Sequence, residues 1–173
     1  HGCLDTGFLA TPFLLDAFVK IGRRDLAIKL LWQTRMPSWL YEVEQGATSV
    51  WESWDAVTPG AEPRITSYNH YAFGCVDAWI FENLAGIRAL EPGFRRVEIA
   101  PDPDGVPLEY CRRSFRCEYG DLLVFWDRQT LRVSIPCGVR AIIRWQGASH
   151  EVGSGEYTFT KSQTGGVQNE RTG

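Results

Sequence analysis

Residues 122–145, LLVFWDRQTLRVSIPCGVRAIIRW, decide the fold class of the C-terminal half of this chain. Apolar and polar residues alternate along 131–135 and again along 139–145. A period of two is typical of strands that bury one face. The run 122–126 is apolar throughout and predicts a central strand, while Pro136-Cys137-Gly138 predicts a hairpin turn between two of these strands.

The alternation returns farther along the chain, at Tyr157 and Phe159. Several short strands at regular spacing predict a small antiparallel β-sandwich over residues 91–162. The alternation also places Trp126 and Trp145 in its core rather than on a sugar-binding face. Residues 163–173 carry little to bury, so we expect a disordered tail there.

The first half has a helical period instead. Thr11-Pro12 predicts a helix start with Thr11 as N-cap, a second helix follows at about 24–34, and Asn69 is the expected cap of a third that runs to about 85. Residues 37–68 are rich in Pro, Gly, Ser and Thr and are expected to form a long loop. Because such loops are uncommon in compact domains, this one is expected to be functional.

Composition narrows the classes of function. The 173 residues carry a net charge of −3 without a basic run, which argues against nucleic-acid binding, and no apolar run is long enough for a membrane span. The five cysteines form no C-x-x-C motif. Unpaired thiols indicate a reducing, cytoplasmic compartment. The chain starts at His1 without a signal peptide, and we expect it to be the C-terminal end of a longer protein.

Residues 46–55, GATSVWESWD, hold one carboxylate between two indoles. Indole faces suit the C–H side of a pyranose, and a carboxylate can activate water at an anomeric carbon. Glu52 is therefore the candidate catalytic base of a glycoside hydrolase. The alternative is a loop residue that is solvated or paired with Arg64. Glu42 and Glu44 lie nearby but lack the two indoles.

Each neighbouring candidate has a structural alternative. Trp51 and Trp54 can stack on a sugar or anchor the loop, and we do not expect both to touch the ligand. His70 can contact a sugar hydroxyl or cap the helix that follows it. Asp5 and Asp55 are acidic too, and turn chemistry accounts for both.

The ordered motifs of residues 1–90 resemble those of bacterial α-L-rhamnosidases. They are Asp5-Thr6-Gly7-Phe8 with Thr11-Pro12, Pro37-Ser38-Trp39-Leu40-Tyr41, Gly46-Ala47-Thr48 before Trp51-Glu52-Ser53-Trp54, Asn69-His70-Tyr71-Ala72-Phe73-Gly74, and Ala85-Gly86-Ile87. The resemblance implies an α+β fragment of two domains and a tail. Residues 1–90 would be the last helices of an (α/α)6 toroid, the six-hairpin catalytic domain, and residues 91–162 a C-terminal β-sandwich.

The resemblance also implies a reaction. Such enzymes release terminal α-L-rhamnose from glycosides with inversion, using one carboxylic acid and one carboxylate. Glu52 matches the carboxylate that activates water, and His70 matches a histidine that contacts the bound rhamnose. The acid belongs to an upstream motif absent from this chain, so the fragment alone is expected to be inactive. Ser53 replaces an arginine common in the family. No organic cofactor is expected, and no residue of this chain is assigned as a metal ligand; calcium binding by the parent enzyme stays open.

Three other interpretations stay open. The β part could be a non-catalytic carbohydrate-binding module, or it could only brace the toroid. The helical part could belong to a toroid hydrolase that acts on another sugar.

Overall fold

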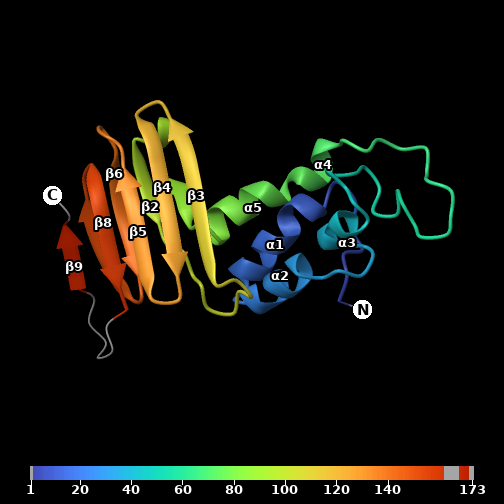
Figure 1. Ribbon diagram of the computed structural model, residues 1–173, viewed down its shortest axis with the longest axis horizontal. Helices are drawn as coiled ribbons and strands as arrows, with labels where there is room; N and C mark the ends of the chain where they lie inside the picture. Colours follow the sequence, from blue (N-terminus) through green and yellow to red (C-terminus); the bar gives the residue numbers. More distant parts are fainter. Residues whose placement is uncertain (1, 162–167, 172–173) are drawn as a thin grey trace. The chain divides into compact units, whose positions relative to one another are not determined.

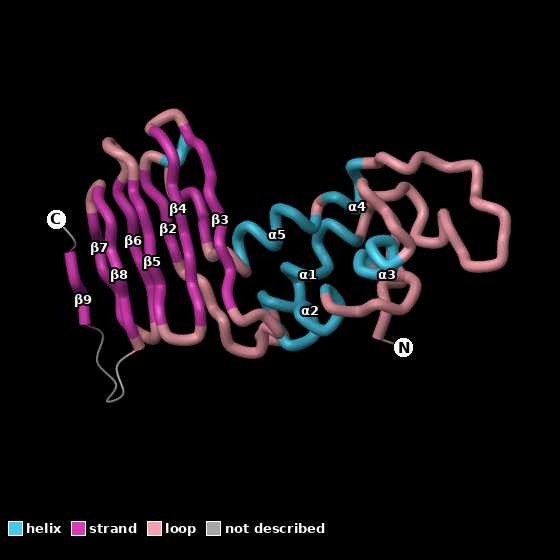
Figure 2. The backbone as a smooth tube through the Cα atoms, viewed as in Figure 1, coloured by secondary structure: helices cyan, strands magenta, loops and turns pink. Residues whose placement is uncertain are grey.

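The computed structural model describes residues 2–161 and 168–171, and the chain divides into two compact units, residues 1–79 and 80–173. Helices and loops build the first unit, and strands build most of the second (Figures 1 and 2). The boundary between residues 90 and 91 stays a prediction.

The first unit is built on short helices. Helices α1 and α2 pack against each other, with Leu15 and Ala27 among the buried residues. The helices of the chain are α1 Thr11–Lys20, α2 Arg24–Leu31, α3 Trp39–Glu44, α4 Tyr71–Gly74 and α5 Val76–Asn83, the last of which continues into the second unit.

The predicted helices exist, but their ends differ. Ala10 takes the N-cap position of α1, and Thr11 is its first helical residue. The Thr11 hydroxyl donates instead to the carbonyl of Gly7, at 2.9 Å. The predicted third helix divides into α4 and α5, and its cap is His70 rather than Asn69, because the His70 ring accepts the Ala72 N–H.

The long loop predicted over residues 37–68 contains helix α3, which the sequence interpretation missed. Ser38 caps this helix and accepts the N–H of Tyr41 at 3.1 Å. Three of its six residues are buried. The chain from Gln45 to His70 then has no helix or strand and forms the long loop drawn between α3 and α4 in Figure 2.

The second unit contains two sheets, in the strand orders β1-β2-β6-β7 and β3-β4-β5-β8-β9. Neighbours are antiparallel except β2 and β6, which are parallel. The strands are β1 Ile87–Ala89, β2 Arg96–Ile99, β3 Tyr110–Cys117, β4 Gly120–Asp127, β5 Thr130–Ile135, β6 Arg140–Trp145, β7 Ala148–Val152, β8 Gly155–Thr160 and β9 Gln168–Arg171; a 3-10 turn, η1, covers Pro92–Phe94.

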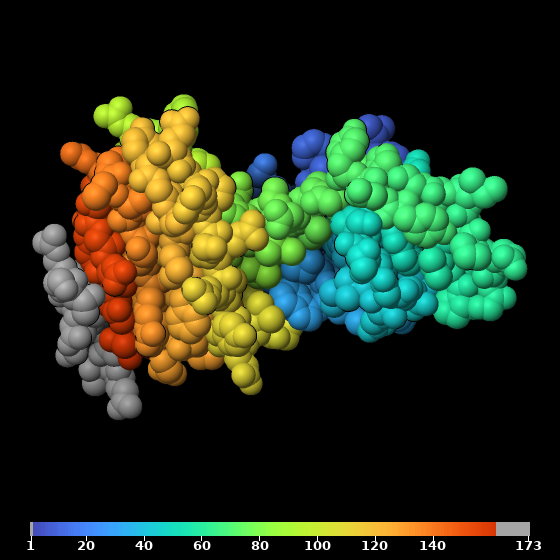
Figure 3. All heavy atoms as spheres, turned by 45° about the horizontal axis from the view of Figure 1, so that its top comes forward, coloured from blue at the N-terminus to red at the C-terminus, as the bar shows by residue number. Residues whose placement is uncertain are grey.

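The two sheets share one apolar core, as the alternation predicts. Trp126 and Trp145 are 0% and 1% exposed, and Phe159 is fully buried. The indole N–H of Trp126 donates to the carbonyl of Leu84 at 2.6 Å, so its polar atom is satisfied inside the core. In the space-filling view the atoms of residues 110–160, yellow to red, form a continuous surface (Figure 3).

The hairpin predicted at Pro136–Gly138 is wrong. Strand β5 pairs with β4 and β8, whereas β6 pairs with β2 and β7 of the other sheet. The connection therefore passes from one sheet to the other. The apolar run at 122–126 does lie in a strand with a neighbour on each side, as predicted.

The expected disordered tail falls mostly outside the described residues, while Gln168–Arg171 form β9 beside β8. All five cysteines lie within the described residues and are free thiols. In the part of the chain that the structure describes, no helix has the length and apolar character of a membrane span.

Candidate active site

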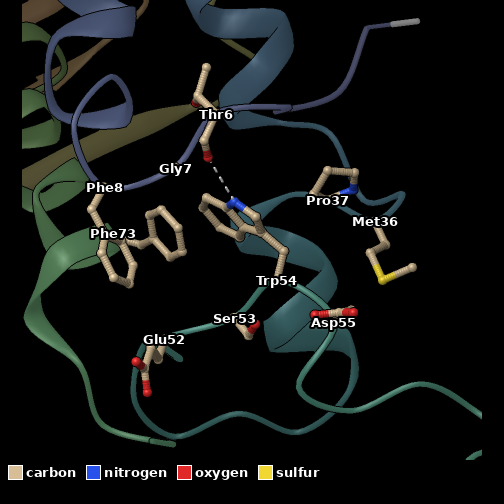
Figure 4. A pocket seen from close by; sticks show the side chains of 10 residues that line it. All are labelled: Thr6, Gly7, Phe8, Met36, Pro37, Glu52, Ser53, Trp54, Asp55 and Phe73. Carbon is tan, nitrogen blue, oxygen red and sulfur yellow. Dashed lines mark hydrogen bonds between the residues drawn. The ribbon is translucent and has the colours of Figure 1, made fainter. Parts of the chain in front are cut away.

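The turn at residues 52–55 forms one wall of a cavity of about 420 Å³ in the first unit. Figure 4 shows Trp54 at its centre, with Glu52 and Asp55 on opposite sides. Most of the wall is apolar. The lining residues are Thr6, Gly7, Phe8, Met36, Pro37, Glu52, Ser53, Trp54, Asp55 and Phe73.

Glu52 is held by a segment far along the loop. Its Oε2 accepts the N–H of Ser67 at 2.9 Å and the hydroxyl of Thr66 at 3.1 Å, and its own N–H donates to the Ser67 carbonyl at 3.0 Å. The Ser67 N–H lowers the pKa of the Glu52 carboxyl most, with help from Thr66 and from the nearby His70. The carboxylate therefore stays ionised near neutral pH, as a base must.

The suggested pair between Glu52 and Arg64 is absent. Arg64 Nη1 instead donates to both carboxylate oxygens of Asp55, at 2.6 and 2.8 Å. This pairing is the main reason that the pKa of Asp55 lies below its usual range. Asp55 thus stays ionised and is unsuited to the role of proton donor. Asp5, the other acidic candidate, is exposed and does not line the cavity.

Trp54 reaches the cavity and is fixed on three sides. Its indole stacks on Phe73, with ring centroids 3.8 Å apart, and meets the edge of Trp39 at 5.5 Å. Its N–H donates to the Thr6 carbonyl at 3.2 Å. These contacts hold the Trp54 indole in the cavity wall. Its stacking on a sugar stays a prediction.

Trp51 lies elsewhere. It is 4% exposed, packs edge-on against Tyr68 with centroids 5.8 Å apart, and is not among the lining residues. The structure therefore favours the anchoring interpretation for Trp51. The two indoles that frame Glu52 in the sequence therefore lie in different surroundings, one in the cavity wall and one buried against Tyr68.

His70 sits beside the cavity rather than in its wall. Its ring is stacked with Phe8 and with Tyr71, at centroid distances of 5.0 and 5.2 Å. The Nδ1 atom accepts the Ala72 N–H at 3.3 Å, so the proton of a neutral ring is on Nε2. His70 thus has one donor left for a ligand hydroxyl. Its contact with a sugar stays a prediction.

The rival carboxylates do not face the cavity. Glu42 is 3% exposed; burial raises the pKa of this carboxyl to about 7, although the Trp51 N–H bonded to it acts in the opposite sense. A raised pKa suits a general acid. Glu42 does not line the cavity, however, so it is not placed to protonate a leaving group there. Glu44 is exposed and also lies outside the wall.

Several residues of the site were missed from sequence. Phe8, Met36 and Phe73 line the cavity, and Thr66 and Ser67 hold Glu52. Only the helix-cap pattern at Ser38 offered a local signal for α3. The partners of Glu52 gave none, because they depend on how a long loop folds back.

Known proteins match this chain in two adjoining parts. The model of the bacterial alpha-L-rhamnosidase 6 hairpin glycosidase domain matches residues 1–84, and that of the bacterial alpha-L-rhamnosidase C-terminal domain matches residues 86–158. An α-L-rhamnosidase of Streptomyces avermitilis is 35% identical in an alignment 185 residues long. This alignment covers 91% of this chain and 18% of that protein. One of Formosa agariphila is 38% identical over 127 residues, or 72% of this chain and 14% of that protein.

Solved structures give the same result. The crystal structure of the Streptomyces avermitilis α-L-rhamnosidase complexed with L-rhamnose matches 93% of this chain and 18% of its own, with a TM-score of 0.86 and 33% identity. The crystal structure of the native Aspergillus terreus α-L-rhamnosidase matches 91% of this chain and 19% of its own, with a TM-score of 0.84 and 33% identity.

The chain spans less than a fifth of the length of these relatives. A kojibiose phosphorylase structure matches at 11% identity and a TM-score of 0.54, which shows a shared fold alone. The two family models and the relatives agree in order and extent with the helical and β parts described above. Residues 1–84 of the chain belong to the six-hairpin glycosidase domain family of bacterial α-L-rhamnosidases, and residues 86–158 belong to the C-terminal domain family of the same enzymes.

Proposed function

We propose that this chain is the C-terminal part of an inverting α-L-rhamnosidase in which Glu52 is the general base. The observation that carries the proposal is an ionised carboxylate at the edge of an apolar cavity, beside the indole of Trp54. The similarity to α-L-rhamnosidases supports the choice of sugar.

The hydrogen bonds of Glu52 suit this task. Two hydrogen bonds from described residues reach the Glu52 carboxylate, and Oε2 accepts both of them. Oε1 is therefore left to take a proton from water. As the water oxygen attacks the anomeric carbon, its proton passes to Glu52, and an acid on the opposite face protonates the departing oxygen.

The acid is not among the carboxyl groups of the cavity wall, because Asp55 is ionised and paired with Arg64. We place it in the part of the protein upstream of this chain. In inverting enzymes the two carboxyl groups stand roughly 6.5–9.5 Å apart, which leaves room for the water. The isolated chain is accordingly proposed to be inactive.

The wall of the cavity suits a deoxyhexose. Phe8, Trp54 and Phe73 present apolar surface where the methyl group and the C–H face of rhamnose can pack. The Nε2–H of His70 would bind a hydroxyl at the rim. These two contacts would orient the ring above Glu52.

For the β-sandwich we propose a bracing role rather than sugar binding. Both tryptophans of the sandwich, Trp126 and Trp145, are in the core, so neither offers an indole face to a sugar; its exposed aromatic side chains are tyrosines, Tyr110 and Tyr119. The free thiols of all five cysteines, each within the described residues, support a proposed cytoplasmic location. A rhamnosylated glycoside or polysaccharide is the proposed partner.

The decisive test uses the full reading frame that encodes these residues. Glu52→Gln should lower kcat on para-nitrophenyl α-L-rhamnoside by about 10³-fold, because general-base catalysis supplies 10²- to 10⁴-fold. Glu44→Gln, on exposed surface, is the control. A fall of less than about tenfold with the fold intact removes Glu52 from the reaction.

Two further readouts separate the alternatives. Proton NMR should detect β-L-rhamnose as the first product, since inversion converts an α-glycoside into a β-sugar. If the α-anomer appears first, the mechanism is retaining. Greater turnover of an aryl fucoside or glucoside than of the rhamnoside would favour a toroid hydrolase of another sugar.

A further inference from the structure

The buried carboxyl of Glu42 needs an explanation. It is 3% exposed, and its Oε1 finds no hydrogen-bond partner among the described residues. Leaving a carboxyl oxygen buried and unpaired is costly. An apolar residue of similar size would suit this position better, unless the other oxygen performs a task there.

The other oxygen has such a task. Glu42 Oε2 accepts the backbone N–H of Trp51 at 3.0 Å, and this group is buried. Trp51 directly precedes Glu52, whose own N–H is bonded to the Ser67 carbonyl at 3.0 Å. Two successive peptide groups are therefore held from different sides, one by helix α3 and one by the returning loop.

Helix α3 also holds the far end of the same turn. The hydroxyl of Tyr41, the neighbour of Glu42, donates to the carbonyl of Val57 at 2.8 Å. In addition, the ring of Trp39 meets Trp54 at the middle of the turn. Of the residues between the attachments at Trp51 and Val57, residues 52–55 line the cavity.

We propose that Glu42 is a positioning residue for Glu52: through Trp51 it fixes the backbone that presents the base to the cavity. This inference rests on the proposed function of Glu52. Glu42 does not line the cavity, so it acts only through the Trp51 peptide. Displacement of a catalytic group by about 1 Å can cost about 10²-fold in rate.

Two substitutions separate reach from charge. Glu42→Gln keeps an oxygen at the same distance and removes the charge. Glu42→Asp keeps the charge but withdraws the oxygen by about one C–C bond, roughly 1.5 Å. The exposed Glu44 on the same helix supplies the control Glu44→Asp.

The expected results differ between the two. In the full-length protein Glu42→Asp should lower kcat on the aryl rhamnoside by about 30-fold with KM within about threefold, whereas Glu42→Gln and Glu44→Asp should stay within about threefold of the parent in both. If Glu42 only stabilised the fold, we would not expect Glu42→Asp to lower kcat while Glu42→Gln leaves it unchanged. Equal kcat in the Asp variant and the parent overturns the proposal, as does an equal loss in Asp and Gln.

A second readout does not depend on the reaction. Hydrogen–deuterium exchange of the peptide spanning residues 46–57 should speed up at least about tenfold in Glu42→Asp and remain unchanged in Glu42→Gln. Unchanged exchange in the Asp variant overturns the proposal whatever the activity. If Glu52→Gln retains activity, the proposed function fails. Glu42 then has no catalytic base to position, even if hydrogen–deuterium exchange shows that Glu42 holds the loop.

Discussion

The guanidinium of Arg64 binds both carboxylate oxygens of Asp55 and neither oxygen of Glu52. This choice of partner separates the two acidic residues of the cavity wall. Asp55 stays ionised, and its charge is balanced by Arg64. The same residue closes the base of the loop, because the Arg64 N–H donates to the Ala56 carbonyl at 3.0 Å. Glu52 stays ionised as well, but the hydrogen bonds to its carboxylate come from the uncharged groups of Thr66 and Ser67.

Loss of the Arg64 pair should affect stability only slightly. Both side chains are about half exposed, and exposed pairs contribute about 0–1 kcal/mol. We expect Arg64→Gln to lower the free energy of unfolding by less than about 1 kcal/mol at low salt, and by less still at high salt. Urea titrations at the two salt concentrations test this, with Arg23→Gln, which breaks a similar exposed pair with Asp25, as the control. A loss above about 2 kcal/mol would mean that the pair organises the loop.

Glu42 should make the helical unit less stable as the pH rises. Burial raises its pKa from 4.5 to about 7 in the folded protein. Between these values the unfolded chain has released the proton and the folded chain retains it, so stability falls with pH and then levels off above about pH 7. The full effect is on the order of 3 kcal/mol.

Glu42→Gln removes that ionisation. The variant should match the parent near pH 5 and exceed its melting temperature near pH 8, which scanning calorimetry at the two values measures. A difference between variant and parent that is constant with pH would show that Glu42 does not titrate in this range.

The two indoles should respond differently to replacement. Trp51→Phe should cost about 1–3 kcal/mol of stability and leave KM unchanged, because Trp51 is buried away from the cavity. Trp54→Phe should raise KM for the rhamnoside about tenfold, since it removes an indole from the cavity wall. Thermal unfolding and steady-state kinetics of both variants give the comparison. The reverse pattern would restore Trp51 as the sugar contact.

Gly86 should tolerate no side chain. Its φ is +77°, and an added Cβ would lie 2.2 Å from the N atom of Pro101 and 2.5 Å from the carbonyl carbon of Ala100. Both are backbone atoms, so Gly86→Ala should destabilise the sandwich by more than about 3 kcal/mol. Gly105→Ala is the matched control, with φ +72° and open space around the Cβ, and should cost about 1–2 kcal/mol. Chemical denaturation of both variants measures the two losses.

Period-two patterns predicted the strands of the sandwich but not their partners. The alternation around Leu131 and Phe159 depends only on which face is buried, and both residues are indeed fully buried. Pairing depends on the whole sheet. Pro136–Gly138 has the composition of a hairpin turn, yet it connects strands of different sheets, because β6 finds β2 as its neighbour.

The candidate site was predicted in part for a similar reason. The carboxylate between two indoles and the resemblance to a family of enzymes both made Glu52 the candidate base, and Glu52 lines a cavity. Its distant partners Thr66 and Ser67, and the support of Glu42 for Trp51, are contacts across a folded loop. Neither residue type nor spacing encodes such contacts locally.

Among the described strands β2 and β6 form the one parallel pair, and this pair has a consequence for how the chain acquires its fold. Strand β2 lies between β1 and β6, and β6 comes much later in the chain. During synthesis the β1–β2 hairpin therefore has an unpaired edge until Trp145 has left the ribosome. Because β2 and β6 are far apart in the sequence, we expect their pairing to form late in folding. A chain that ends before β6 would expose the β2 edge to other chains, so truncation there should favour aggregation rather than a smaller domain.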